Sequence, residues 1–137
     1  MAGLRDCISS TPIFFLNCSS SSKESGSVRA LLSTRNPEEL AISDLAFHSI
    51  GIILYQKNAQ HLFSDFIEDL FGDGGITLFA LGSEDMKRLE HVSLSFSLDF
   101  DDAYQYVVAE KFDLALVSFD TDFDRTDRKR IIPADIL

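Results

Sequence analysis

The chain has 137 residues, a hydrophobic fraction of 45% and a formal net charge of −10 at neutral pH. This length fits a single domain over residues 1–137, which can bury roughly two-thirds of the surface that its unfolded form exposes. The negative charge argues against a protein that coats nucleic acid through Lys and Arg, but an acidic site that binds a divalent cation would still permit a nuclease.

The N-terminal segment predicts a first buried strand over residues 12–16, followed by a Ser-rich loop. This apolar run is far too short to span a bilayer. The two cysteines, Cys7 and Cys18, form neither a disulfide framework nor a metal-binding spacing, so we expect free thiols in a reducing compartment. We therefore expect a cytoplasmic protein with no membrane partner.

The middle of the chain predicts two amphipathic helices that follow a short strand at residues 41–42. Ser43 or Asp44 is a suitable N-cap for the first of them. The glycine-rich segment after the second should end it by supplying left-handed backbone. The expected helical segments are a short helix around 28–32, a helix start at 36–40, a long helix over 45–56 and a second over 59–71.

The last third of the chain continues the alternation of strands and helices. Strands are expected over residues 76–81 and 114–119, and helices over 83–91 and from about residue 99 onward. This alternation predicts an α/β fold with a mostly parallel central sheet flanked by helices on both faces.

Carboxylates gather at two element ends in this last third. Asp99 and Asp102 begin the second of these helices, whereas Asp120 and Asp122 follow the closing strand. Both groups should lie at the carboxyl edge of the sheet, where α/β folds place their ligands. Clustered acids repel each other unless a cation lies among them, so the pattern indicates a divalent-metal site and a phosphate as the first ligand to consider.

Simpler interpretations of these charges remain open. Asp99 to Asp102 could be only an N-cap with acids that favour the helix dipole. The basic cluster that follows the acidic turn is typical of a solvated loop, with contact to a phosphate as the alternative. Its members are Arg125, Arg128, Lys129 and Arg130.

Three segments carry a resemblance to the PIN domain, the fold of VapC-type toxins and other metal-dependent ribonucleases. Residues 98–105 resemble the acidic helix start of that family, and residues 116–123 resemble its late strand and acidic turn. Residues 41–45 resemble its second strand and the start of the following helix. The order of helices and strands is similar across nearly the whole chain.

The resemblance implies a divalent-metal site that hydrolyses RNA phosphodiesters. It implies Asp102 and Asp120 as catalytic metal ligands, Asp122 and Asp99 as accessory ligands, and Mg²⁺ or Mn²⁺ as the ion. It also implies RNA as the substrate, an antitoxin-like protein as a possible partner, and a possible homodimer.

Two departures from the family pattern favour an alternative function. The acid after the first strand is replaced, in our alignment, by Ser10, and the glutamate of the helix after the second strand is replaced by Ser49. Asp44 lies about one helical turn before that position and could partly substitute. The alternative is therefore a degenerate PIN-like module that binds a protein or RNA partner without cutting it.

Overall fold

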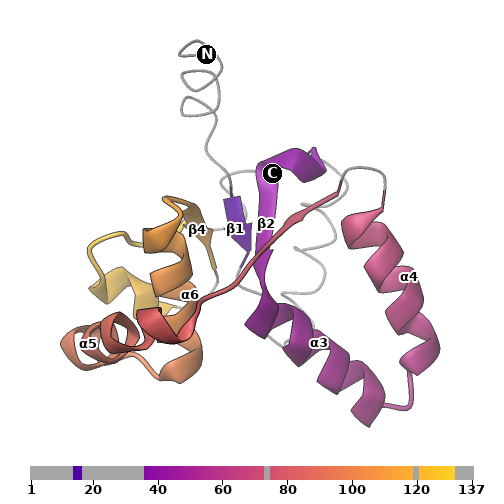
Figure 1. Ribbon diagram of the computed structural model, residues 1–137, viewed down its shortest axis with the longest axis horizontal. Coiled ribbons are helices and arrows are strands. Elements are labelled where there is room, and N and C mark those ends of the chain that lie inside the picture. Colours follow the sequence, from indigo (N-terminus) through magenta and orange to yellow (C-terminus); the bar gives the residue numbers. More distant parts are fainter. Residues whose placement is uncertain (1–13, 17–35, 73–74, 119–120, 132–137) are drawn as a thin grey trace.

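The computed structural model describes residues 14–16, 36–72, 75–118 and 121–131 (Figure 1). Within these ranges the strands form one four-stranded parallel sheet in the order β3-β2-β1-β4. The strands are β1 (Phe14–Leu16), β2 (Leu40–Ser43), β3 (Thr77–Phe79) and β4 (Ala115–Val117). The predicted parallel α/β sheet is confirmed, whereas the helix expected around residues 28–32 lies outside the described residues.

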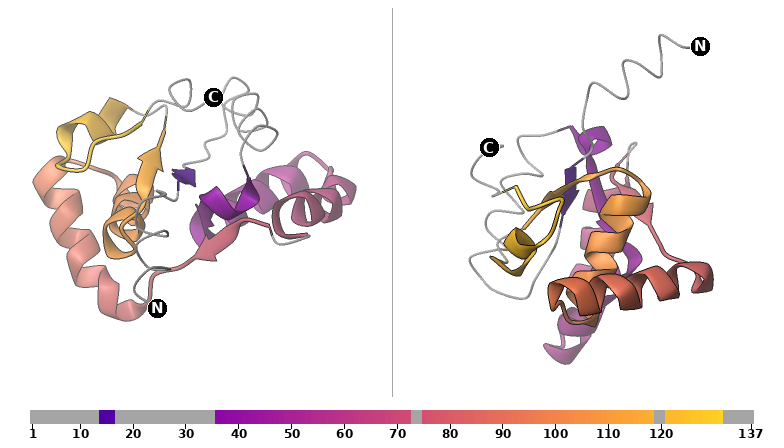
Figure 2. Two further views of the ribbon diagram at one scale, coloured as in Figure 1. Left: turned by 90° about the horizontal axis from the view of Figure 1, so that it is seen from above. Right: turned by 90° about the vertical axis from the view of Figure 1, so that its left-hand side faces the viewer.

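Helices cover both faces of the sheet, as the sequence predicts. In Figures 1 and 2, α3 and α4 lie on one side of the strands, and α5 and α6 lie on the other. These helices are α3 (Asp44–Gln56), α4 (Gln60–Phe71), α5 (Met86–Phe96) and α6 (Phe100–Lys111). Among the described residues, none of the helices has the length and hydropathy that a membrane span requires.

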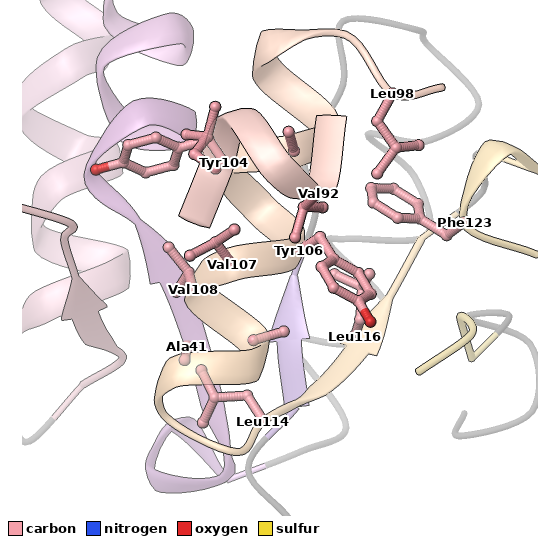
Figure 3. Close-up of a cluster of buried hydrophobic side chains, with 13 residues drawn as sticks. Ala41, Val92, Leu98, Tyr104, Tyr106, Val107, Val108, Leu114, Leu116 and Phe123 are labelled. Atoms are coloured by element: carbon pink, nitrogen blue, oxygen red, sulfur yellow. The ribbon is translucent and has the colours of Figure 1, made fainter. Parts of the chain in front are cut away.

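Alternation along the strands divides the core into two clusters. Ala41 and Leu116 belong to the cluster formed with α5 and α6, which Figure 3 shows. Leu40, Ile42 and Val117 belong to the cluster formed with α3 and α4. Successive side chains of a strand point to opposite faces, so β2 and β4 each contribute to both clusters.

Helix α6 is buried over its middle two turns, because it packs between the sheet and α5. Every residue from 102 to 109 is buried, which leaves this part of the helix without a solvent-facing side. The ring of Phe123, from the 3-10 turn η3 (Thr121–Arg125), is fully buried in the same cluster (Figure 3). Consequently η3 is held against α5 and α6 by apolar packing.

Side-chain caps fix where two of the helices begin. The Ser43 hydroxyl oxygen accepts a hydrogen bond from the Ala46 amide at 3.0 Å, and the Asp99 carboxylate accepts one from the Asp102 amide at 3.0 Å. Each bond satisfies an amide that has no partner within its helix. The capping residues predicted for α3 and for the acidic helix are therefore confirmed.

Other element bounds differ from the expectation. Helix α5 continues to Phe96 rather than ending near His91, and it stops where Ser97 adopts a left-handed conformation with φ of 55°. The expected helix start at 36–40 is instead a short 3-10 turn, Pro37–Glu39, that runs directly into β2. The closing strand and β3 are each three residues long, because pairing involves only their central parts.

Gly72 and Gly75, which follow α4, are required for close packing rather than for left-handed backbone. Gly72 has φ of −71°, so the expected left-handed conformation is wrong at this position. A Cβ atom at Gly72 would lie 2.6 Å from the Glu68 carbonyl oxygen, and one at Gly75 would lie 1.9 Å from the Leu70 carbonyl oxygen. The chain therefore passes the end of α4 too closely for any side chain.

Candidate acidic site at the carboxyl edge of the sheet

Buried polar side chains mark one edge of the sheet. Strand β2 ends at Ser43, and Ser118 follows β4. Helix α6 leads into β4 and therefore starts at the carboxyl edge of the sheet. Four of the five buried polar residues in the described ranges lie on these elements: Ser43, Asp102, Gln105 and Ser118. This gathering of buried polar side chains makes the edge a candidate site, because polar groups are seldom buried without a structural or functional role.

Asp102 is the most buried of the predicted site carboxylates that the structure describes. It lies in the first turn of α6, and it is 9% exposed. Its backbone amide bonds to Asp99, so the capping interpretation accounts for Asp99 without a metal ion. Of the predicted site carboxylates in the described residues, Asp102 is the buried one, so a metal site at this edge would depend on it.

The acidic turn after β4 is described only in part. Asp122 lies in η3, and its Oδ1 accepts a hydrogen bond from Arg125 Nη1 at 3.0 Å. Asp120 lies outside the described residues. Within those residues, no three His, Cys, Asp or Glu side chains lie close enough together to hold a metal ion. A cation site of carboxylates would therefore have to draw on Asp120 or on other residues outside the described ranges.

A hydrogen-bonded tyrosine joins three elements beside the acidic helix start. The Tyr104 hydroxyl donates to Asp44 Oδ1 at 2.7 Å and accepts from the Leu81 amide at 2.9 Å. Burial of Tyr104, together with the neighbouring Asp44 carboxylate, raises the pKa of the Tyr104 hydroxyl to about 12. The sequence offers no signal for this contact, because the two partners are 60 positions apart.

The residue in place of the family glutamate is engaged within its own helix. The Ser49 hydroxyl donates to the Leu45 carbonyl oxygen at 2.8 Å, which is the usual bond of a serine to the preceding helical turn. Asp44, the proposed substitute, accepts hydrogen bonds from Tyr104 and from the Leu45 amide at 2.8 Å. Both side chains thus have structural roles, which argues against a replacement of the family glutamate by a residue of α3.

The basic cluster has a structural role in the described chain. Arg125 donates to the carbonyl oxygens of Phe96 and Ser97, which lie at the end of α5. Arg128 forms an ion pair with Asp113 at 2.8 Å, and Arg130 forms one with Asp124 at 3.1 Å. These bonds satisfy helix-end carbonyls and carboxylates, so they account for the three arginines without a bound phosphate.

Comparison with known proteins identifies the family. A model of the PIN domain matches residues 13–129. The chain belongs to the PIN domain family. Members of this family generally depend on divalent metal ions. No curated protein matches the chain.

Solved structures with a fold similar to this PIN domain include the following two. A toxin-antitoxin complex from Klebsiella pneumoniae contains a chain with 14% identity and a TM-score of 0.61; the match covers 87% of this chain and 96% of that one. The protein PAE2754 from Pyrobaculum aerophilum has 18% identity and a TM-score of 0.64, with coverage of 92% and 93%. At these identities the likeness shows the shared fold.

The alignment of Ser10 with the first acid of the family is wrong. The family match begins at residue 13, and β1 begins at Phe14, so Ser10 precedes the strand that the acid should follow. The residue that follows β1 in the chain is Asn17, which itself lies outside the described residues. The signal was present in the sequence, since the apolar run ends at Leu16. Asn17 thus comes directly after the first strand, where the resemblance places the first acid.

The donor chemistry at this edge fits a hard divalent cation. Mg²⁺ and Mn²⁺ prefer oxygen ligands, which include amide carbonyl oxygens as well as carboxylates. Asp102 supplies a buried carboxylate, and one turn further along α6 the Oε1 atom of Gln105 is buried without a hydrogen-bond partner in the structure. A buried acceptor of this kind is a place where a cation or its bound water would be stabilised.

Proposed function

We propose that this PIN domain, with residues 1–137 as one domain, is a Mg²⁺- or Mn²⁺-dependent endoribonuclease that hydrolyses RNA phosphodiesters. The observation that carries the proposal is the buried Asp102 carboxylate at the carboxyl edge of a sheet of PIN type. Asp102 and Asp120 are proposed to hold the cation, with Asp122 and Asp99 as accessory ligands. When bound, the cation would supply an activated water and neutralise charge on the phosphate.

The proposal includes a protein partner. The similar structure from Klebsiella pneumoniae is a toxin-antitoxin complex, which supports an antitoxin-like partner for this chain. A homodimer is proposed as well, and the exposed apolar side chains of α3 and α4 would suit it. These are Ile52, Tyr55, Leu62 and Ile67.

A second candidate is a module that binds a partner without cutting RNA. Ser49 supports it, because this residue stands in place of the family glutamate and its hydroxyl bonds to its own helix. Asn17 supports it too, because an amide replaces the acid after β1. Two of the family's acids are then absent, which favours weak metal affinity and slow cleavage.

The first experiment measures Mn²⁺ binding by calorimetry and cleavage of RNA by the same samples. Asp102→Asn should weaken Mn²⁺ binding by at least about tenfold, since even the loss of a supporting residue costs that much. Asp120→Asn should abolish cleavage, and so should a chelator. Asp101→Asn is the matched control, because Asp101 is an exposed acid in the same helical turn. An equal loss of Mn²⁺ affinity in Asp102→Asn and Asp101→Asn would refute a specific role for Asp102.

Restoring the missing acids separates the two candidates. Asn17→Asp with Ser49→Glu should raise both Mn²⁺ affinity and cleavage, because two hard ligands are returned. Ser10→Asp with Ser49→Glu is the control, since residue 10 precedes the family match. If the wild type does not cleave RNA and the restored variant does, the protein is a module that binds without cutting. A restored variant that binds no better than the wild type would refute the site.

A further inference from the structure

Gln105 carries an unexplained polar group in the interior of the protein. Its side chain is 3% exposed, and its Oε1 atom is the one buried side-chain atom of the described residues that has no hydrogen-bond partner in the structure. A buried acceptor without a partner costs free energy, and native proteins keep few of them. Such an atom calls for an explanation, and an ion or water that binds to the protein is one.

The position of Gln105 associates it with the acidic edge. It lies three residues after Asp102 on α6, and residues at this spacing are neighbours on one side of a helix. The rise of the helix separates the two backbone positions by about 4.5 Å along its axis. Asp102 lies in the first turn of α6 and Gln105 in the turn that follows, and both residues are buried.

The remaining sides of α6 have assigned contacts in this region. Tyr104 bonds to Asp44, and the ring of Tyr106 lies against the ring of Phe96 with centroids 5.6 Å apart. Val107 and Val108 belong to the apolar cluster shown in Figure 3. Asp102 and Gln105 are the buried polar residues of this helix, and apolar packing does not account for their polar groups.

We propose that the Gln105 amide oxygen is a further oxygen donor of the divalent-cation site, in the coordination shell beside Asp102. This inference rests on the proposed function. An amide carbonyl is a hard, neutral ligand, so it adds coordination without adding to the repulsion among carboxylates. It would compensate in part for the acids that are absent at positions 17 and 49. Gln105 then belongs to the site, although the sequence marks it only as a residue in a helix.

The test compares Gln105→Met with the wild type in two measurements, using the full chain and MnCl₂ alone as the probe. Met is apolar and similar in size, so it removes the buried acceptor without leaving a large cavity. In metal-free buffer, Gln105→Met should raise the melting temperature, by about 3 °C. It should also weaken Mn²⁺ binding in calorimetry by roughly tenfold. Gain of stability together with loss of affinity is the expected signature.

Gln105→Glu should have the opposite effect on both the metal-free melting temperature and the Mn²⁺ affinity. A carboxylate at this position adds a hard ligand, so Mn²⁺ should bind more tightly. The same charge lies near Asp102 in a buried place, so the metal-free melting temperature should fall. Gln60→Met is the control, because Gln60 is an exposed glutamine at the start of α4. It should change neither measurement.

Each outcome decides the proposal. A lower metal-free melting temperature for Gln105→Met would overturn it, because the amide would then have a partner within the chain. If the wild type binds Mn²⁺ and Gln105→Met binds it equally well, the assignment of Gln105 is overturned. The proposed function is then left intact. A wild type that binds no Mn²⁺ would refute the proposed function, and the assignment of Gln105 would fail with it.

Discussion

Removal of the Tyr104 hydroxyl tests whether the contact beside the acidic edge stabilises the fold. Tyr104→Phe deletes one bond to a carboxylate, at 2.7 Å, and one from a backbone amide, at 2.9 Å. A bond to a charged group contributes about 1.5 to 3 kcal/mol, and a neutral bond about 0.5 to 1.5 kcal/mol. Asp44 keeps its bond from the Leu45 amide and is only partly buried, so the lower values apply. We therefore expect a loss of about 2 kcal/mol.

The same variant has a distinctive pH dependence. The pKa of Tyr104 is about 12 in the folded protein, against an ordinary value of 10.0, mainly because the side chain is buried. The unfolded chain therefore loses this proton first as the pH rises. The stability that the hydroxyl contributes is complete below pH 10 and disappears between pH 10 and about 12. Tyr104→Phe lacks this group, so the difference from the wild type should shrink over that interval.

Urea denaturation at pH 8 and at pH 11 measures both effects. Tyr55→Phe is the control, because Tyr55 is 56% exposed and its hydroxyl should contribute little. The stability of Tyr104→Phe should itself still fall as the pH rises, though less than that of the wild type, because burial also raises the pKa of Tyr106. Equal stability of Tyr104→Phe and the wild type at pH 8 would refute the structural role of the hydroxyl. A difference that stays constant up to pH 11 would refute the coupling to its ionisation.

Three further predictions concern the support of α6, and each is measured as the free energy of unfolding. Asp99→Ala should cost about 1 kcal/mol through loss of the N-cap, whereas Asp99→Ser should retain most of the stability. Glu110→Gln should cost only about 0.5 kcal/mol, because the bidentate pair with Arg88 lies at the surface. Arg88 lowers the pKa of Glu110, so this cost should be present above about pH 4.5 and vanish as the pH falls through the lowered pKa. Phe123→Ala should cost about 3 to 5 kcal/mol, because the buried ring leaves a cavity; a cost below 1 kcal/mol would contradict its place in the core.

Local patterns predicted the elements that depend on neighbouring residues. Ser43 and Asp99 were recognisable as caps, because a short polar side chain precedes a helical pattern. The alternation of strands and helices predicted a parallel sheet covered on both sides. The same alternation predicts that the acids of the last third share an edge, and Asp120 lies outside the described residues. These features follow from spacing along the chain, which a sequence displays directly.

Features that depend on distant contacts were not predictable in this way. Tyr104 and Asp44 meet only after the chain has folded, and nothing near either residue indicates the other. The burial of Gln105 depends on packing around α6, whereas its neighbours in sequence give an ordinary helical pattern. Ser10 fails for another reason, because it precedes the apolar run, whereas the acid is expected after the strand. Glu90 and Glu110 lie on helices too, yet only structure separates such surface acids from Asp102.

The central place of β1 in the sheet has a consequence for how the protein is made. Phe14 pairs with Leu40 on one side and with Ala115 on the other. The second neighbour of the first strand is therefore synthesised only after most of the domain. Pairings between such distant segments form slowly, because a long loop must close first. On the ribosome, the half of the sheet that contains β2 and β3 can assemble early, whereas β4 joins last. A nascent chain therefore carries Asp102 before the fold that buries it is complete.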